Sequence, residues 1–243
     1  MKKTFTVIAF LALSLGAFAQ NTGKDRLEEL ENKTVEEKST PKKAEKEYEL
    51  FDFNILARMG GGYINVADQR FKPQNSYEFF LNTLEFELNP TKWLGLSLGL
   101  DLKWNSFIPK PEYVFSRDTN NDPIIIDTPA QREKNVSKLN VFSLAVPLSI
   151  TFNFGSDFGL SLGAEAVYTP ASKARIKDSY SIGDADYKVT IGPCNYPAFK
   201  WNIFACLYYG MAGVYFRFYP TEPLLPFSLQ SNSSVGVIFN LAR

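Results

Sequence analysis

The chain has 243 residues, 26 basic and 26 acidic side chains, and no histidine. A formal charge of zero argues against nucleic-acid binding, which needs a basic surface. The lack of histidine excludes Ser-His-Asp and Cys-His catalysis, histidine general bases and the usual zinc enzymes. With only two cysteines, neither a disulfide scaffold nor a four-cysteine zinc site can form. The aromatic content, 21 Phe, 12 Tyr and 3 Trp, is high for a soluble enzyme.

The N-terminal fifty residues form two segments that we expect to lie outside the folded domain. Residues 1–19 have the three regions of a secretory signal: Lys2 and Lys3, an apolar run over 5–15, and an A-x-A site that places cleavage after Ala19. Residues 20–50 hold seven Lys/Arg and nine Asp/Glu with few large apolar residues, so they cannot bury enough surface to fold alone. We interpret 20–50 as a periplasmic spacer, largely disordered or partly helical. The alternative is a helix that docks a partner.

From Phe51 onward, apolar residues recur with a period of two, which predicts β-strands. The clearest case is the run Leu94 to Trp104, where every second residue is large and apolar and the residues between are small or polar. Eight such segments are predicted, at 51–67, 76–89, 94–105, 142–153, 160–168, 201–209, 214–219 and 235–241. Two details break the pattern: Gly60–Gly62 predicts a bulge, and Asn82 falls on an apolar face, for which another bulge is the one account we have.

The connections between these segments alternate in length. Short ones fall at 89–92, 154–157 and about 209–211, and long ones at about 68–75, 106–137, 169–197 and 220–230. Short periplasmic turns, long extracellular loops and two periplasmic termini are typical of even-stranded outer-membrane barrels. We therefore predict an all-β fold over 51–243, an eight-stranded antiparallel up-and-down transmembrane β-barrel. Aromatics near the strand ends predict two interfacial girdles, which include Trp93, Trp104, Tyr168, Trp201, Tyr209 and Tyr219.

A soluble eight-stranded barrel such as a lipocalin is the alternative fold. It too alternates, but its apolar face points inward and its water-exposed outer face is rich in charge. Here the second face holds mainly Gly, Ser, Ala, Thr and Asn with sparse charges. That composition favours a narrow lumen packed with side chains.

These features resemble the small outer-membrane β-barrels of Gram-negative bacteria, in particular the PorT-like and general outer-membrane β-barrel families. The resemblance covers Phe51 to Arg243 and includes the last strand, Ser234 to Leu241. In those families the barrel-assembly machinery reads a terminal aromatic or apolar residue. Phe239 and Leu241 would serve here, although Ala242 and Arg243 follow. The resemblance implies a monomer in outer-membrane lipid with no cofactor. Barrel enzymes of this shape rely on histidine, so we predict no enzymatic activity, no catalytic residues and no metal site.

The predicted polar face places a set of charged and amide side chains in the lumen: Arg58, Glu85, Asp101, Lys103, Glu165, Asn202 and Arg217. An eight-stranded barrel is just wide enough for its own side chains, and buried charges must pair. We expect a structural network of ion pairs and hydrogen bonds. A gated ion pore and a ligand-binding lumen are the alternatives.

Three features of the long loops have open interpretations. Asp118–Asp122 matches the opening D-x-N-x-D of a calcium loop but lacks the Gly at position six and the Glu at position twelve, which favours a solvated turn. Ile124–Ile126 is expected to form a loop hairpin, to pack on the barrel end or to contact a partner. Cys194 and Cys206 are expected to be unpaired unless the third long loop folds back into the barrel.

The sequence thus predicts a non-enzymatic outer-membrane protein. It would act through its extracellular loops or as an accessory in envelope assembly or secretion. The loops at 106–137 and 169–197, or the spacer, are the expected contacts for an envelope or secretion protein, because binding residues concentrate on loops held by a rigid scaffold. A small pore for ions or solutes, and a soluble periplasmic lipid-binding barrel, remain the alternative functions.

Overall fold

A computed structural model of the chain describes residues 50–72, 74–155, 157–220 and 231–241. All of them belong to one compact unit, Tyr48–Arg243. The predicted signal at 1–19 and the spacer at 20–50 lie outside the described residues, apart from Leu50. Among the described residues, no helix has the length and apolar character needed to cross a membrane.

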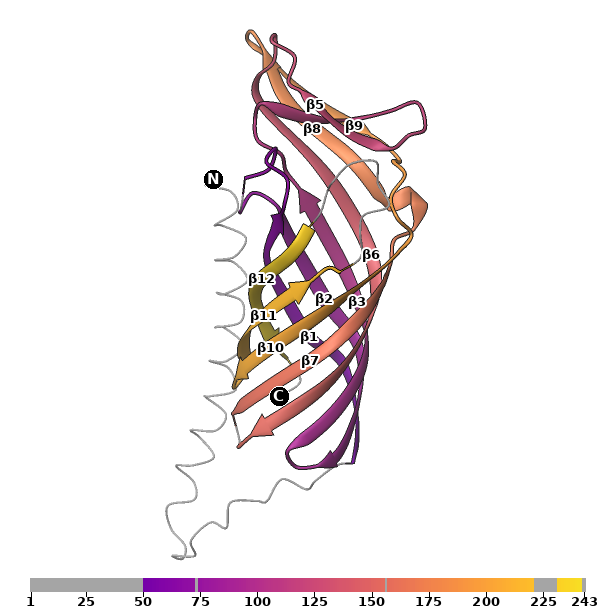
Figure 1. The fold of residues 1–243 in the computed structure, drawn as a ribbon, viewed down its shortest axis with the longest axis vertical. Helices are drawn as coiled ribbons and strands as arrows, with labels where there is room; N and C mark the ends of the chain where they lie inside the picture. The colour runs from indigo at the N-terminus through magenta and orange to yellow at the C-terminus, as the bar shows by residue number, and fades with distance from the viewer. Residues whose placement is uncertain (1–49, 73, 156, 221–230, 242–243) are drawn as a thin grey trace, which may run out of the picture. The chain divides into compact units, whose positions relative to one another are not determined.

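Eight antiparallel strands close into a barrel (Figure 1). Their order around it is β3-β2-β1-β12-β11-β10-β7-β6, and pairing of β3 with β6 completes the circle. The strands are β1 (Phe51–Val66), β2 (Tyr77–Thr91), β3 (Leu94–Phe107), β6 (Glu133–Phe154), β7 (Phe158–Tyr168), β10 (Phe199–Tyr209), β11 (Ala212–Phe218) and β12 (Ser231–Asn240). Closure leaves the barrel without a free sheet edge, and it confirms the predicted fold class.

The barrel has a turn end and a loop end. The turn end holds the short connections after β2, β6 and β10, and the loop end holds the connections after β1, β3, β7 and β11. Of the last of these, residues 221–230 lie outside the described residues. The alternation of short and long connections agrees with the sequence prediction.

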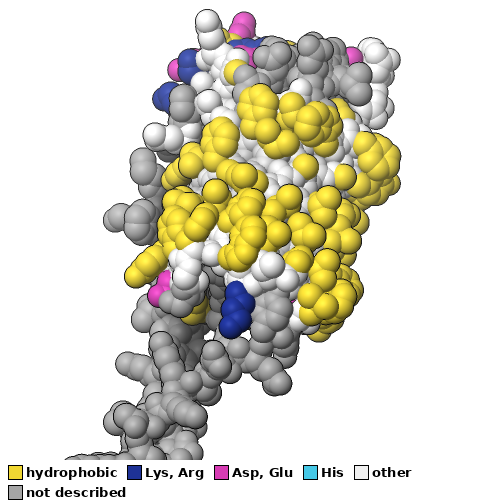
Figure 2. Space-filling view, turned by 60° about the horizontal axis from the view of Figure 1, so that its bottom comes forward, with side chains coloured by type: hydrophobic (Ala, Val, Ile, Leu, Met, Phe, Trp, Pro, Cys, Tyr) yellow, Lys and Arg dark blue, Asp and Glu magenta, His cyan; other side chains and the backbone are white. Residues whose placement is uncertain are grey.

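Side chains alternate between an apolar outside and a polar inside, as the period of two requires. In β10, Trp201 is 47% exposed and Ile203 is 46% exposed, whereas Asn202 between them is fully buried. Figure 2 shows the result on one face, where apolar side chains form a broad belt with charged side chains above and below it. The soluble-barrel alternative is wrong, because its apolar face would have to line the lumen.

Of the two expected bulges, the one at Gly60–Gly62 is wrong and the one at Asn82 is present. Gly60, Gly61 and Gly62 pair regularly with both β2 and β12, so they form no bulge. A Cβ on Gly62 would lie 2.3 Å from the carbonyl oxygen of Val235, so glycine is needed there for space. The break in β1 lies instead between Ile55 and Arg58, where the register with β2 shifts.

Asn82 is not on the apolar face. A register shift between Asn82 and Leu84 reverses the alternation of β2, so that Asn82 points inward although Leu84 and Phe86 point outward. The predicted strand was therefore correct in position. Its inward-facing residues are even-numbered up to Asn82 and odd-numbered from Glu85 onward.

The long loops at the loop end carry four further strands, two of which extend the barrel sheet (Figure 1). Between β3 and β6, the strands β4 (Tyr113–Arg117) and β5 (Pro123–Asp127) form a hairpin, which is the hairpin interpretation of Ile124–Ile126. After β7, the short 3-10 turn η1 (Ala171–Lys173) leads into β8 (Ala174–Ile182) and β9 (Ala185–Ile191). β8 pairs with the part of β6 that extends beyond the barrel, and β9 pairs with β8. We call β8, β9 and residues 133–141 of β6 the protruding sheet.

An apolar cluster lies at the loop end of the barrel. It joins barrel residues such as Ile64 and Val141 to loop residues such as Phe115 of the hairpin, and all of these are buried. The remaining buried members are Val66, Phe71, Phe107, Ile125, Leu139, Ala174, Ile176 and Cys194. We call this cluster the apolar cap. Its barrel members come from β1, β3 and β6, so it packs the loops onto that side of the loop end.

Candidate functional site

The predicted lumen residues all lie buried inside the barrel: Arg58, Glu85, Asp101, Lys103, Glu165, Asn202 and Arg217. They are carried by six different strands, and none is more than 9% exposed. Because alternation aims every second residue inward, strands far apart in sequence bring these side chains together. The contacts sort them into a central network and a smaller cluster toward the turn end.

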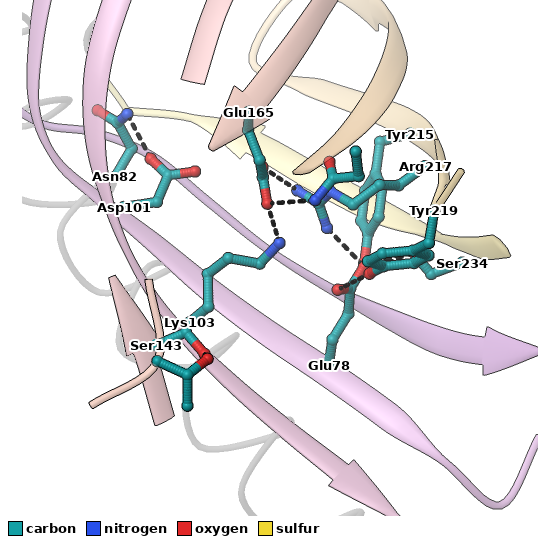
Figure 3. A network of polar contacts seen from close by, with 12 residues as sticks. Glu78, Asn82, Asp101, Lys103, Ser143, Glu165, Tyr215, Arg217, Tyr219 and Ser234 are labelled. Atoms are coloured by element: carbon teal, nitrogen blue, oxygen red, sulfur yellow. Dashed lines mark hydrogen bonds and ion pairs between the residues drawn. The ribbon is translucent and has the colours of Figure 1, made fainter. Parts of the chain in front are cut away.

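Arg217 is the centre of the network (Figure 3). Its Nη1 donates to Oε1 of Glu78 at 2.6 Å, and its Nη2 lies 3.2 Å from Oε2 of Glu165. Lys103 forms an ion pair with Glu165, which also accepts a hydrogen bond from Nδ2 of Asn202 at 2.9 Å. The Arg217 guanidinium thus bridges the two buried carboxylates, and the Lys103 ammonium pairs with one of them. Charges buried in a low-dielectric interior need such pairing.

Glu78 was not predicted, although it is the most heavily bonded carboxylate described. It accepts hydrogen bonds from the hydroxyls of Tyr215 at 2.8 Å, Ser234 at 2.6 Å and Tyr219 at 2.9 Å, in addition to Arg217. The bulge at Asn82 hid it, because parity counted back from Glu85 and Glu87 places Glu78 on the wrong face. The alternation of Glu78, Phe80 and Asn82 on one face was the usable signal.

Tyr219 corrects the predicted aromatic girdle. It follows Tyr215 and Arg217 in parity, so its hydroxyl points inward to Glu78. The other five predicted girdle residues, Trp93, Trp104, Tyr168, Trp201 and Tyr209, are exposed on the outer wall. Trp104 contacts the ring of Phe142 at 5.3 Å near the loop end, and Trp93 stacks on Phe152 at the turn end.

A second cluster lies toward the turn end. Arg58 forms an ion pair with Glu85 and donates to the hydroxyl of Tyr208 at 3.3 Å. Beneath it lies a cavity of about 30 Å³, lined by Arg58, Tyr208, Asn89, Asn153, Asn240 and four further residues. A volume of that size holds about one water molecule.

Asp101 is hydrogen-bonded to an amide side chain. Nδ2 of Asn82 donates to its Oδ1 at 2.7 Å, and no ion pair to a described cation reaches it within 4.0 Å. Gly99 makes room for that amide, because a Cβ there would lie 2.5 Å from Nδ2 of Asn82. Among the described residues, three buried lumen cations (Arg58, Lys103, Arg217) face four buried carboxylates (Glu78, Glu85, Asp101, Glu165), and the half-buried Glu87 lines the turn-end cavity.

The polar groups of the D-x-N-x-D motif in the loop between β3 and β6 are hydrogen-bonded within the protein. Oδ1 of Asp118 accepts hydrogen bonds from the backbone N–H groups of Asn120 and Asp122, both at 2.8 Å, which is the turn interpretation of the D-x-N-x-D motif. The backbone N–H of Asn195 donates to the carbonyl of Asn121 and holds the hairpin tip against the following loop. Cys194 and Cys206 are both free thiols and both buried.

The chemistry available in the described part of the chain is ionic and structural. Within the described residues, no group of three or more His, Cys, Asp or Glu is placed to hold a metal ion. Outside the membrane-facing wall, burial raises the pKa of the Asp178 carboxyl, which the Ser137 hydroxyl and Arg132 lower in part. Burial likewise raises the pKa of the Cys194 thiol.

A closed antiparallel barrel with an apolar outer belt and charges inside is a transmembrane β-barrel of the outer-membrane type. No protein-family model matches the chain, and no curated protein matches it. Among solved structures it is similar to Ail, the attachment invasion locus protein of Yersinia pestis, with 9% identity over 77% of this chain and 92% of that chain and a TM-score of 0.31. At that level of likeness, the fold assignment rests on the strand pairing of this chain itself.

Proposed function

We propose that this chain is a non-enzymatic outer-membrane protein whose barrel is a closed scaffold for the protruding sheet and the β4–β5 hairpin. In this proposal the turn end faces the periplasm and the loop end faces the outside. The signal at 1–19 exports the chain, and the spacer at 20–50 lies in the periplasm. The loops at 106–137 and 169–197 contact a partner of the envelope or secretion machinery, the role that a PorT-like accessory would have.

The observation that carries the proposal is the pairing of charged side chains across the lumen. Ion pairs of Arg217, Glu165, Glu78 and Lys103 join strands on different sides of the barrel. The apolar cap packs the loops onto the β1, β3 and β6 side of the loop end. A hydrated ion needs a continuous water-filled path, and the described cavity toward the turn end has room for about one water. A scaffold therefore accounts for the lumen better than the pore alternative does.

The loops support an interaction role because they are folded. The backbone N–H of Phe115 in β4 donates to Oγ of Ser137 in β6 at 2.9 Å, and Phe115 itself packs in the apolar cap. Loops fixed in this way present a preformed surface, which lowers the entropic cost of binding. On that surface, Tyr187 of β9 and Ile126 of β5 are exposed.

Site-specific photo-crosslinking in cells tests the interaction role. A photoreactive residue at Tyr187 or at Ile126 should yield a discrete crosslinked protein band that mass spectrometry can identify. The same residue at Leu148, which is exposed on the apolar belt, is the matched control and should yield no such band. Absence of protein adducts from both loop positions would remove the support for an interaction role.

Planar-bilayer recording separates the scaffold from the pore. The scaffold predicts a flat current over many insertions of the folded protein, with insertion verified by protease protection. Reproducible unitary conductance steps at neutral pH would make the pore the better function.

A further inference from the structure

The outer face of the protruding sheet continues the lipid-facing wall of the barrel. In β6, Val146, Leu148 and Ile150 point outward. The pairing of β6 with β3 runs without a shift from Phe142 to Leu139, and its pairing with β8 runs without a shift from Val141 to Val136. Alternation therefore keeps even-numbered residues on the outer face as far as Lys138.

Four basic side chains gather on this outer face, and we call them the basic patch: Lys138, Arg175, Lys177 and Lys188. Lys138 and Lys177 are directly opposite each other on β6 and β8, Arg175 is the next outward residue of β8, and Lys188 is opposite Ser179 on β9. Three of the four are exposed and Lys138 is half-buried. Like charges directly opposite in a sheet are destabilising, so the protein alone gives no reason for this arrangement.

The patch is not neutralised by neighbouring acids in the described structure. Its four members form no ion pair with any described carboxylate within 4.0 Å. Asp178 lies on the same strand but is buried on the opposite face. Asp186 lies toward the tip and accepts a hydrogen bond from Ser181 at 2.7 Å. The patch therefore presents a local excess of positive charge.

The height of the patch above the apolar belt is set by the strand geometry. Phe142 and Trp104 belong to the loop-end aromatic band, and just beyond them Ser106 donates to Asn140 at 2.7 Å. Lys138 lies four residues beyond Phe142, about 13 Å along the strand or about 10 Å in height for a tilt of about 40°. The polar headgroup layer is about 5–7 Å thick on each side, and lysine stems extend several ångströms toward it.

We propose that the basic patch binds the phosphate groups of an anionic lipid in the membrane leaflet at the loop end. This inference rests on the proposed function, because it needs the barrel in a membrane. Lysine and arginine bind phosphate through charge-assisted hydrogen bonds. The acyl chains would lie on the apolar wall directly below the basic patch, over Leu144 and Val146. An amphiphile therefore fits both the basic patch and the apolar wall, whereas a free anion would contact the basic patch alone.

Lipid binding by the folded full-length protein in nonionic micelles tests the proposal. The probe is a bis-phosphorylated diglucosamine acyl lipid, and the comparison is the same lipid with both phosphates removed. Native mass spectrometry measures the apparent Kd. The phosphorylated lipid should bind in a salt-dependent manner, and the dephosphorylated lipid should bind far more weakly.

Paired substitutions locate the site. The double variant Lys138→Gln/Lys177→Gln should weaken binding about 25-fold, because each cation near an anionic surface contributes about fivefold, or about 1 kcal/mol. The double variant Lys72→Gln/Lys92→Gln removes two other lysines, one in the first long connection and one in a turn-end connection, and should leave the Kd unchanged.

The proposal is overturned if the Lys138/Lys177 variant binds as wild type, or if both lipids bind equally. It is also overturned if inorganic phosphate competes at millimolar concentration, because a free anion would then be the ligand. Heat-dependent gel mobility of every variant reports the barrel separately. A chain without that mobility shift contradicts the proposed function, whereas a shifted chain without phosphate dependence contradicts the basic patch alone.

Discussion

The charge network in the lumen makes a quantitative prediction for Arg217. The variant Arg217→Met keeps a side chain of similar length but leaves Glu78 and Glu165 without the guanidinium that lies between them. Removing one partner of a buried ion pair costs about 3–5 kcal/mol, because the remaining charge stays buried. Lys103 and three hydroxyls remain on the two carboxylates, which favours the lower half of that range.

Urea unfolding of the protein in lipid vesicles, followed by tryptophan fluorescence, measures this loss. With a slope of about 2 kcal/mol per molar urea, the midpoint should fall by roughly 1.5–2 M. The matched control is Arg117→Met, which changes an exposed arginine of β4 and should cost less than about 0.5 kcal/mol. The double variant Arg217→Met/Glu78→Gln should recover part of the loss, because one of the uncompensated charges is removed.

Two outcomes would refute this reasoning. Equal midpoints for the Arg217 and Arg117 variants would mean that the guanidinium carries no buried charge pairing. A double variant no more stable than Arg217→Met would mean that lost packing, and not the stranded carboxylate of Glu78, causes the loss.

Three further predictions concern the belt and the protruding sheet. Leu148→Arg, at a belt position, should lower the free energy of unfolding by about 2–4 kcal/mol. The control Ile182→Arg, at an exposed position of β8, should lower it by less than about 0.5 kcal/mol. Equal losses would contradict the placement of the belt. Because burial raises the pKa of the Cys194 thiol, a maleimide at neutral pH should label Cys194 of the folded protein slowly. In the variant Ser179→Cys, the new exposed thiol should be labelled rapidly, and mass spectrometry measures both rates. Equal rates would argue against a buried Cys194. Burial raises the pKa of Asp178 in the folded state, so the folded state binds the proton more tightly and stability falls as pH rises from about 4 through the raised value. Hydrogen-exchange protection of β8 should follow that trend and Asp178→Asn should abolish it; an unchanged pH dependence in that variant would assign the trend to another group.

The barrel strands were predictable because a wall with an apolar outer face and a polar inner face requires alternating residues in the sequence. Every strand that crosses an apolar belt must alternate, and the run from Leu94 to Trp104 shows the pattern without a break. Short and long connections also follow from the sequence, since turns and loops interrupt the alternation. The boundaries at the turn end agree within a few residues for this reason.

Glu78 and Tyr219 show where such reasoning fails. The bulge after Asn82 shifts the parity of β2. Asn82 signalled that bulge, but the new parity was not carried back along the strand, so Glu78 was missed. Tyr219 was assigned by its nearness to a strand end, although its parity with Arg217 already pointed it inward. For each residue, the partner lies more than 100 positions away in sequence, which no local pattern encodes.

The protruding sheet and most of the apolar cap were not predicted from the sequence, although packing of Ile124–Ile126 on the barrel end was one of the expected interpretations. Phe71, Phe115 and Ile125 lie in connections that the period of two does not cover, and they meet only through the tertiary fold. β8 and β9 have nine and seven residues, and the alternation in β9 (Tyr187, Val189 and Ile191 against Asp186, Lys188 and Thr190) was overlooked within a long loop. Their pairing depends on β6 extending past the barrel to offer an edge.

The central claim is that the outer wall, with its two aromatic bands, spans a bilayer. The chain has three tryptophans, Trp93 near the turn end and Trp104 and Trp201 near the loop end, and all three are exposed on that wall. The most direct measurement is therefore quenching of wild-type tryptophan fluorescence by lipids brominated at different depths. The account predicts strong quenching by bromines close to the headgroups and weak quenching at the bilayer centre. Fluorescence that no bromolipid quenches, or that the deepest bromines quench most, would contradict it.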